Sequence, residues 1–399
     1  MLRFLTAGES HGPSLTAILE GIPAGLALPA QVIDRELERR QQGYGSGGRM
    51  KIEKDVVEIL GGVMAGETTG SPIALQVMNA DHVKWKGKAI EPLTSPRPGH
   101  ADLTGAIKYG YHDLRPALER ASARETTMRV AAGAVCKHFL MQFGIMVGGY
   151  VRAIGEVNSD PGDMPYLERF ERAEQSDIRC PNEEAAQRMR ARIEEIIHGK
   201  DTLGGILEII ALGVPAGLGS YAQWDRRIEA RLAMALMSVQ AMKGVEIGDA
   251  FENSRLPGTR AHDSIRISSS KKVAPQDLQA PSLTRETNRA GGIEGGITNG
   301  QPIVMRVAMK PIATTLTPQM TVNLATKEES PTTYERSDFC PVPRAVPILE
   351  SMAAFVLAEA LIEKLGGDSL TEMKPRFETL RMAAIEDLPM DNTAHIWWE

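Results

Sequence analysis

The segment at residues 348–365 constrains the fold more than any other part of this sequence, because it has the length of a helix and is apolar nearly all round. Residues 232–242 form a second segment of this kind. Helices without a polar face are buried, and Gly366 and Gly367 supply a glycine stop for the first one. Together with a helix that opens near Ser122, these segments predict a central helix layer that short strands cover on both sides.

The secondary structure expected around this layer consists mainly of short strands. Apolar runs bounded by turn residues predict strands at residues 2–6, 15–20, 56–60, 145–154, 204–218 (including a turn) and 303–309. Helical patterns appear at residues 30–41 and, after the capping residue Asn182, as far as His198. Residues 159–182 are polar and are expected to be irregular.

Size and composition limit the class of protein. A chain of 399 residues favours either two domains or one large layered domain. The hydrophobic content of 42% and charged content of 24% are those of a globular protein, while a net charge of −6 and 5% aromatic residues argue against nucleic-acid binding. We find no signal-peptide pattern and no apolar run long enough to cross a bilayer, so a cytoplasmic protein without membrane contact is expected. Three cysteines without paired spacing predict neither a disulfide nor a metal site.

Residues 97–130 are rich in groups that bind anions, namely Arg97, His100, Arg115, Arg120, Ser122 and Arg124. The sequence S-A-R-E predicts a capping box, in which the Ser122 hydroxyl accepts a hydrogen bond from the amide of Glu125. Arginines such as Arg120 and Arg124 are unfavourable at a helix start unless an anion lies beside them. The stretch therefore predicts a phosphate or carboxylate site. The alternative is a surface helix start with solvated arginines.

Two loops near the N-terminus could also carry chemistry. His11 follows the first predicted strand, and a loop histidine is either simply solvated or functional, because its side chain titrates near neutral pH. Residues 43–48 match G-x-G-x-x-G, but a helix precedes them and a strand follows, which is the wrong context for a dinucleotide-binding turn. A flexible loop that closes on an anion, with Arg39, Arg40 and Arg49 at its ends, is the better interpretation.

The second half of the chain contains further candidates. Gln240, inside a predicted buried helix, is either a hydrogen-bonded core amide or a ligand contact. The glycine run at residues 291–300 lacks G-K-[ST], so a nucleoside-triphosphate P-loop is excluded. The segments at residues 268–290 and 315–335 are long enough to be lids, binding loops or disordered. The residues alone thus indicate an enzyme or binding protein for a multiply anionic small molecule, with a phosphorylated cofactor.

Three blocks of sequence resemble the chorismate synthase family. They are G-E-S-H-G at residues 8–12, then G-H-A-D-L-T-G-A-I-K-Y-G at 99–110 with R-A-S-A-R-E-T at 120–126, and R-S-D at 336–338 with the apolar helix that ends in G-G-D at 366–368. The glycine-rich run at residues 291–301 is similar as well, and the likeness extends from Met1 to about Asp368.

The resemblance implies an α+β fold, a β-α-β sandwich with a central helix layer between two antiparallel sheets. It implies one domain over residues 1–399, with the tail after about residue 368 outside the likeness, and assembly as a homotetramer. The implied reaction is the anti-1,4-elimination of phosphate from 5-enolpyruvylshikimate 3-phosphate to give chorismate. Reduced FMN is the implied cofactor, with no net redox change, and NADPH enters only as an indirect source of reducing equivalents.

Site residues carried over by motif fall into three groups. The implied flavin contacts are Arg120, Ala121, Ser122, Gln240, Ala241, Gly295, Lys310, Pro311, Ile312, Ala313, Thr314 and Arg336. The implied substrate contacts are Arg40, Arg49 and Arg124. His11 is implied as the acid that protonates the departing phosphate, His100 as the residue that sets the protonation state of the flavin, and Asp338 as an aid to proton transfer to flavin N5.

One departure from the family pattern is Ser46, where relatives commonly carry arginine. It concerns a contact to a nicotinamide nucleotide, for which Arg40, Arg49 and Arg97 could supply the charge. Two other functions stay open, a flavin-binding reductase that consumes a nicotinamide nucleotide and a non-catalytic binding module. The tail at residues 393–399, with Trp397 and Trp398, is an interface element or disordered.

Overall fold

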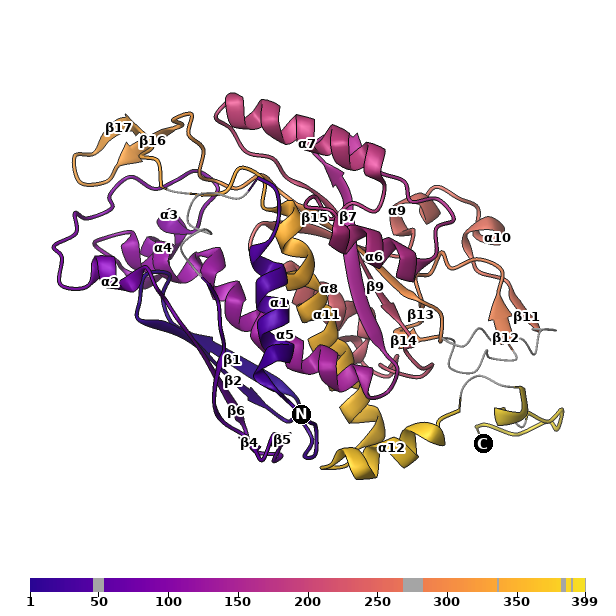
Figure 1. The fold of residues 1–399 in the computed structure, drawn as a ribbon. Helices are drawn as coiled ribbons and strands as arrows, with labels where there is room; N and C mark the ends of the chain where they lie inside the picture. Colours follow the sequence, from indigo (N-terminus) through magenta and orange to yellow (C-terminus); the bar gives the residue numbers. More distant parts are fainter. Residues whose placement is uncertain (46–53, 268–282, 336, 382–384, 389, 399) are drawn as a thin grey trace.

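The computed structural model describes residues 1–45, 54–267, 283–335, 337–381, 385–388 and 390–398. A layer of helices lies between two antiparallel sheets (Figure 1). One sheet has the strand order β1-β2-β6-β3, and the other has the order β10-β15-β9-β7-β8. The expected β-α-β sandwich of the α+β class is therefore confirmed.

The first sheet is built by the N-terminal part of the chain, from β1 Arg3–Ala7, β2 Ser14–Glu20, β3 Glu58–Gly61 and β6 Ile73–Met78. The second sheet contains β7 Met146–Ile154, β8 Val157–Asn158, β9 Gly205–Leu212, β10 Met242–Ile247 and β15 Ile303–Met309. Side chains alternate between the two faces of a strand. On β9, Leu207 and Ile209 belong to the main core, whereas Ile210 packs in a separate cluster on the outer face.

The helix layer consists of α1 Ala30–Gln41, α5 Thr126–Met141, α8 Ile228–Met237 and α11 Val342–Leu365. The two helices α5 and α11 pack closely, because a Cβ atom added at Gly133 would lie 2.2 Å from the Cβ of Ser351. Glycine is thus required for this approach.

The helix α11 begins at Val342 rather than at residue 348, with Pro343 in its first turn and Pro347 inside it. Proline is favoured at a helix start but removes a hydrogen bond in the interior, so the sequence pattern concealed this first part. By length and composition the complete helix could cross a membrane, contrary to our expectation that no segment could. However, 83% of its most apolar window is buried inside the fold, so it is a core helix.

A buried ion-pair network joins three helices of the layer. Glu350 of α11 is 0% exposed and lies 2.7 Å from Arg39 of α1 and 2.8 Å from Lys137 of α5. Burial alone would raise the pKa of Glu350, but these two cations lower it to about 2. The carboxylate therefore stays charged and holds α1, α5 and α11 together.

Smaller elements surround the sandwich. They are the helices α2 His82–Trp85, α3 Asp102–Tyr109, α4 Arg115–Ala121, α6 Tyr166–Gln175, α7 Glu183–His198, α9 Ala250–Asn253, α10 Gly258–Ala261 and α12 Leu370–Glu378, the 3-10 turns Ala123–Glu125, Trp224–Arg226 and Ile385–Asp387, and the hairpins β4 Val63–Met64 with β5 Glu67–Thr68, β11 Ile265–Ile267 with β12 Leu283–Arg285, β13 Ile293–Glu294 with β14 Ile297–Thr298, and β16 Met320–Asn323 with β17 Glu328–Pro331.

Several sequence predictions agree with these elements and others do not. The helix α1 and the strand β15 occupy the predicted residues, and Asn182 caps α7 by accepting a hydrogen bond from the amide of Ala185 at 2.9 Å. The prediction of irregular structure at residues 159–182 is wrong, because α6 lies there. Tyr166, Phe170 and Ala173 of α6 recur at helical spacing, so the sequence carried a helical signal that the surrounding polar residues obscured.

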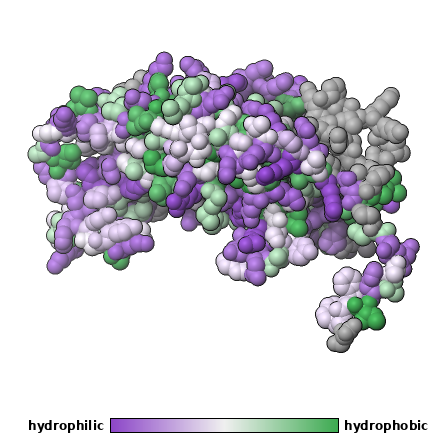
Figure 2. All heavy atoms as spheres, turned by 90° about the horizontal axis from the view of Figure 1, so that it is seen from below, coloured by the Kyte–Doolittle hydropathy of each residue, from purple (hydrophilic) through white to green (hydrophobic). Residues whose placement is uncertain are grey.

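The C-terminal tail projects from the body of the molecule (Figures 1 and 2). Trp397 and Trp398 are exposed there, and the Trp397 ring lies 6.0 Å from the ring of His395, centroid to centroid.

Candidate functional site

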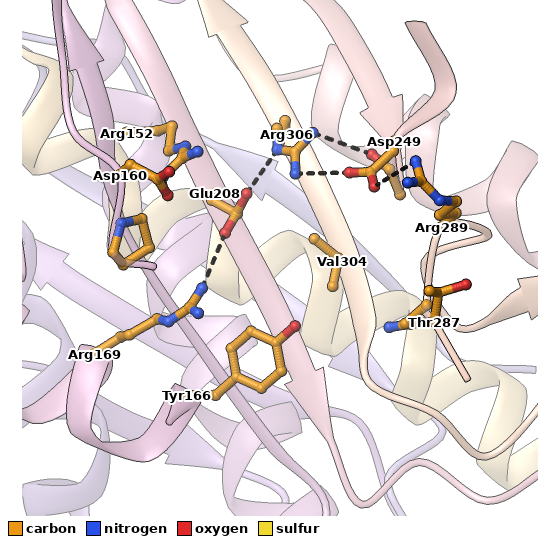
Figure 3. A pocket seen from close by; sticks show the side chains of 13 residues that line it. Arg152, Asp160, Tyr166, Arg169, Glu208, Asp249, Thr287, Arg289, Val304 and Arg306 are labelled. Carbon is orange, nitrogen blue, oxygen red and sulfur yellow. Dashed lines mark hydrogen bonds and ion pairs between the residues drawn. The ribbon is translucent and has the colours of Figure 1, made fainter. Parts of the chain in front are cut away.

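Two cavities lined by described residues are compared, and the first lies on the outer face of the five-stranded sheet with a volume of about 380 Å³ (Figure 3). Arg306 of β15 donates from Nε to Glu208 of β9 at 2.6 Å and pairs with Asp249 at 3.1 Å. Glu208 also accepts from the Tyr150 hydroxyl. The charged side chains of this cavity thus largely neutralise one another, and none of the predicted site residues lines it.

The second cavity, of about 420 Å³, lies between the first sheet and the helix layer and contains two of the predicted flavin contacts. Its lining is Phe4, Leu5, Thr6, Arg120, Glu125, Arg129, Ser238, Gln240 and Met352. Because the predicted residues meet here, we take this cavity as the candidate site.

Glu125 is the central polar residue of this cavity. Its carboxylate accepts hydrogen bonds from Thr6 at 2.7 Å, from Gln240 at 3.1 Å and from Arg129 at 2.9 Å. Burial alone would raise the pKa of Glu125, but Arg129 and these hydrogen bonds lower it. In contrast, the Oε1 atom of Gln240 is buried and has no hydrogen-bond partner among the described residues.

The location of Gln240 corrects the sequence prediction. The helix α8 ends at Met237, so Gln240 lies in the turn before β10 and not inside a buried helix. Ala241 adopts a left-handed backbone conformation with φ of 67°, which ends helical geometry. The residues of this segment include good helix formers, which is why its sequence looked helical.

The predicted capping box at Ser122 is also wrong. The Ser122 hydroxyl accepts from the amide of Arg124 at 3.3 Å and donates to Ser10, and it precedes a 3-10 turn rather than α5 itself. The Glu125 side chain is held in the cavity instead of reaching back. Tertiary contacts have therefore overridden the local capping pattern.

Arg120 does not lie at a helix start either. It belongs to the last turn of α4, where a cation is favourable. Its guanidinium donates to the carbonyl oxygens of Thr6 at 2.9 Å and Gly8 at 3.2 Å. No external anion is needed to explain this placement.

His11 is presented by the loop between β1 and β2. Its Nδ1 atom lies 2.7 Å from Oε1 of Glu119 on α4, and its backbone amide donates to Oε2 of the same carboxylate at 2.8 Å. Its ring lies 4.2 Å from the ring of Trp85, centroid to centroid. Burial would raise the pKa of Glu119, but the hydrogen bonds from His11 lower it. The histidine is thus held in one orientation by a charged partner.

Asn79 connects the His11 loop to the buried arginines. Its side-chain nitrogen donates to the carbonyl oxygens of Glu9 at 3.1 Å and Gly12 at 2.8 Å, and its oxygen accepts from Nε of Arg124 at 2.9 Å. Arg124 in turn lies 2.6 Å from Oδ1 of Asp55. The anion that faces Arg124 is therefore, at least in part, a carboxylate of the chain itself.

Arg40 binds the other oxygen of Asp55 at 3.2 Å. It also donates to Thr126 Oγ1 at 3.0 Å and to the carbonyl oxygen of Ala123 at 3.1 Å. Burial lowers the pKa of Arg40. The carboxylate of Asp55 raises this pKa, whereas the neighbouring cations Arg344 and Arg124 lower it further.

Asp338 joins this network through Arg344. The Arg344 guanidinium donates to the Asp338 carboxylate and, from Nε, to the carbonyl oxygen of Arg40 at 3.2 Å. A chain of hydrogen bonds therefore leads from Asp338 through the buried arginines and Asn79 to the loop that carries His11.

His100 belongs to a second cluster, in which its Nδ1 lies 2.6 Å from Oδ1 of Asp102. Arg97 binds the same carboxylate from Nε at 2.8 Å and donates to Thr314 at 3.0 Å. Burial would raise the pKa of Asp102, but hydrogen bonds from His100 and Arg97 hold it well below its usual range. Lys310 donates to the carbonyl oxygen of Gly99 at 2.9 Å, so the predicted segment 310–314 borders His100.

The predicted flavin contacts come together only in part. The amide of Lys310 donates to the carbonyl oxygen of Ala241 at 3.0 Å, which joins the segment 310–314 to Gln240. Gly295 lies apart from them, since its neighbour Gly296 accepts from the first residue of α8 and Gln240 follows the last turn. A helix of ten residues spans about 15 Å. Arg49, Ser46 and Arg336 lie outside the described residues.

Sequence reasoning missed the polar partners of the predicted residues, namely Asp55, Asn79, Asp102, Glu119 and Glu125 as a cavity residue. Only Asp102 had a local signal, because it follows His100 by two residues in G-H-A-D. The others meet their partners through the tertiary fold.

Comparison with known proteins gives consistent matches over nearly the whole chain. A family model described as chorismate synthase matches residues 2–362. The chorismate synthase of Aquifex aeolicus (strain VF5) is 53% identical over 394 residues, which cover 94% of this chain and 96% of that protein. That of Geobacter metallireducens is 50% identical and covers 95% and 98%, respectively. A crystal structure of a chorismate synthase superposes with a TM-score of 0.76 at 46% identity, covering 94% of this chain and 96% of that one.

Proposed function

Because the chain belongs to the chorismate synthase family, we propose that the cavity beside Arg120 and Gln240, together with the His11 loop and the His100 cluster, is its active site. The chain is a phosphate lyase of the shikimate pathway, which leads to the aromatic amino acids. It converts 5-enolpyruvylshikimate 3-phosphate to chorismate and phosphate by an anti-1,4-elimination with no net redox change.

Reduced FMN, which members of the family generally use, is the proposed cofactor. The buried Oε1 atom of Gln240 supports this assignment, because it is an acceptor without a donor among the described residues and could take an N–H group of a flavin. The cavity volume of about 420 Å³ is in the range of small-molecule sites. When bound, the reduced flavin would lend electron density to the substrate as phosphate leaves and recover it afterwards.

Residues proposed to hold the flavin are Arg120, Ala121, Ser122, Gln240, Ala241, Gly295, the segment 310–314 and Arg336. Arg120 supplies a guanidinium at the cavity wall, and Lys310 supplies an ammonium group close to His100. Gly295 lies near the start of α8, whereas Gln240 follows its end.

The substrate carries two carboxylates and a phosphate, and we propose that Arg40, Arg49 and Arg124 bind them. The charges around Arg40 support this role. The guanidinium groups of Arg40, Arg124 and Arg344 lie together there with the carboxylates of Asp55 and Asp338. Guanidinium groups are suited to charge-assisted hydrogen bonds with carboxylates and phosphates.

His11 is the proposed acid for the departing phosphate. Glu119 accepts from Nδ1 at 2.7 Å, so the protonated, cationic form of His11 keeps the proton of its opposite ring nitrogen for transfer to the phosphate. The bond from carbon to the phosphate oxygen breaks with its electron pair on phosphate, and the ring proton leaves separately. We propose that Asp338 assists transfer of this ring proton toward flavin N5 and that His100 sets the protonation state of the flavin.

The whole chain is proposed to act as one cytoplasmic domain, since a single core cluster includes residues from Leu2 to Phe377. We also propose a homotetramer, which light scattering tests as four times the chain mass of 43.4 kDa. A flavin reductase is the second candidate function, and NADPH is proposed only as an indirect source of reducing equivalents.

An anaerobic assay tests the proposed function. The purified enzyme is mixed with 5-enolpyruvylshikimate 3-phosphate and chemically reduced FMN, and the absorbance of chorismate is followed. Product should appear with reduced FMN and not with oxidised FMN. Absence of product with reduced FMN would remove the proposed function.

A further inference from the structure

Trp85 is a large aromatic side chain in an otherwise polar segment. It is the last residue of α2, in which the preceding residues Val83 and Lys84 are exposed. Trp85 is partly buried, yet it belongs to neither of the two hydrophobic core clusters that the described residues form. Packing in the core therefore does not account for its position.

The side chain that Trp85 packs against is the proposed acid of the reaction. The ring of His11 lies 4.2 Å from the Trp85 ring, centroid to centroid, at an interplanar angle of 37°. The indole thus covers one face of the imidazole. The guanidinium carbon of Arg115 lies over the Trp85 ring at 5.7 Å from its centroid, within the range of a cation–π contact. Arg115 therefore helps to hold the indole in place.

The contacts of His11 with Glu119 show what the indole adds. Glu119 binds the backbone amide of His11 and the Nδ1 atom of its ring. A hydrogen bond at one ring atom does not by itself prevent the imidazole from tilting. A flat aromatic ring packed against the face of the imidazole opposes this tilt. The direction of Nε2, the ring nitrogen opposite Glu119, is therefore determined by Glu119 and Trp85 together.

The segment around α2 also holds the backbone of the His11 loop. The Nδ1 atom of His82 lies 3.0 Å from the carbonyl oxygen of His11. Because a carbonyl oxygen can only accept, the His82 nitrogen is the donor. Asn79, which precedes α2, donates to two further carbonyl oxygens of the same loop. Trp85 is thus carried by a segment that is itself bonded to the loop it packs against.

We propose that Trp85 is a positioning residue of the active site, whose indole ring packs against His11 and directs Nε2 of the imidazole toward the departing phosphate of the substrate. This inference rests on the proposed function, in which His11 is the acid. Trp85 acts through His11 and does not line the flavin cavity.

The test is the rate of chorismate formation in a single turnover, with full-length enzyme in excess over 5-enolpyruvylshikimate 3-phosphate and with reduced FMN under anaerobic conditions. This rate reports the chemical step rather than product release. Trp85→Leu removes the ring and should lower the rate by about tenfold, because a misplacement of about 1 Å can cost that much or more. Trp85→Phe keeps a flat ring and should recover most of the lost rate. The affinity for FMN should not change in either variant.

A double-mutant cycle separates positioning of His11 from a general effect on the structure. In the His11→Ala background no imidazole is left to direct, so adding Trp85→Leu should leave the remaining rate unchanged. A residue that only stabilised the loop would lower the rate in both backgrounds. Val83→Ala is the matched control on α2, because Val83 is 78% exposed, and it should keep the wild-type rate. If Trp85→Leu does not fold, Trp85→Met, which also lacks a ring, takes its place in the cycle.

The inference is overturned if folded Trp85→Leu forms chorismate at the wild-type rate, if Trp85→Leu lowers the rate equally with and without His11, or if Val83→Ala lowers it as much as Trp85→Leu does. An inactive wild-type enzyme would overturn the proposed function, and this inference with it. The two failures are therefore distinguishable.

Discussion

The Nδ1 atom of His11 lies 2.7 Å from a carboxylate oxygen of Glu119, and the backbone amide of His11 donates to the other oxygen of that carboxylate at 2.8 Å. The two residues are 108 positions apart in the chain. Both contacts are made by one rigid group on α4, so the side chain and the backbone of the histidine are fixed together. This arrangement is typical of a histidine that transfers a proton from its other ring nitrogen.

Replacing His11 with alanine should lower turnover by about 10²- to 10⁴-fold, the usual contribution of a positioned acid. FMN should bind as before, because the histidine does not line the flavin cavity. Glu119→Gln should cause a smaller loss of about 10- to 100-fold, since it removes only the charged partner that orients the ring. Near-normal kcat in His11→Ala, measured by anaerobic chorismate formation, would make His11 a structural loop residue.

Replacing Gln240 with leucine should weaken FMN binding by about tenfold, because the buried acceptor proposed for the flavin is lost. Arg336→Ala should have an effect in the same direction, since a guanidinium beside an anionic flavin is removed. Titration calorimetry measures both. Arg289→Gln alters the other cavity and serves as the control. If only the Arg289 variant loses FMN affinity, the flavin has been assigned to the wrong cavity.

The pair of His100 and Asp102 predicts a pH effect on stability. The pKa of Asp102 is lower in the folded protein than in the unfolded chain, so its stabilising contribution is complete above the unfolded value and is lost as pH falls toward the folded value. The difference in unfolding free energy between wild type and Asp102→Asn should therefore shrink between about pH 5 and pH 2. Urea unfolding at a series of pH values measures it. If the difference in unfolding free energy between the two proteins does not change with pH, the lowered pKa of Asp102 is contradicted.

The buried carboxylate of Glu350 predicts a large loss of stability. Glu350→Gln removes the fully buried anion of the network and leaves Arg39 and Lys137 with Glu36, the other carboxylate that both bind, which should cost about 3 kcal/mol. Glu363→Gln is the control, because Glu363 is mostly exposed and lies 3.2 Å from Arg231. Such surface pairs contribute at most about 1 kcal/mol. Equal losses in the two variants, measured by denaturant unfolding, would show that the buried network does not hold the helix layer.

The periodicity of apolar residues was sufficient to predict a helix or strand where burial of apolar side chains is the dominant signal. The all-round apolar pattern at residues 348–365 predicted the helix layer, and the flanking strands followed from apolar runs such as β15. It was insufficient where distant groups compete with a local pattern. The Ser122 capping box fails because Glu125 is taken by Thr6 and Gln240.

In the candidate site, too, local sequence motifs were predicted and contacts between distant residues were not. The motifs predicted His11, His100 and Arg124 as site residues, but the partners Glu119 and Asp55 come from segments whose local sequence carries no signal for these contacts. Asp102 alone is adjacent enough to its histidine to be suspected from the sequence. Pairing of charges across a fold depends on tertiary packing, which spacing along the chain does not encode.

We propose that this enzyme catalyses an elimination that needs reduced flavin without consuming it. The most direct measurement is the number of chorismate molecules formed per FMN under anaerobic conditions, with chemically reduced FMN and no nicotinamide nucleotide. Phosphate leaves with the bonding electron pair and the ring proton leaves separately, so no electrons are left over. Chorismate should therefore exceed FMN many times. Product limited to one equivalent of FMN, or oxidation of added NADPH in step with product, would contradict the account.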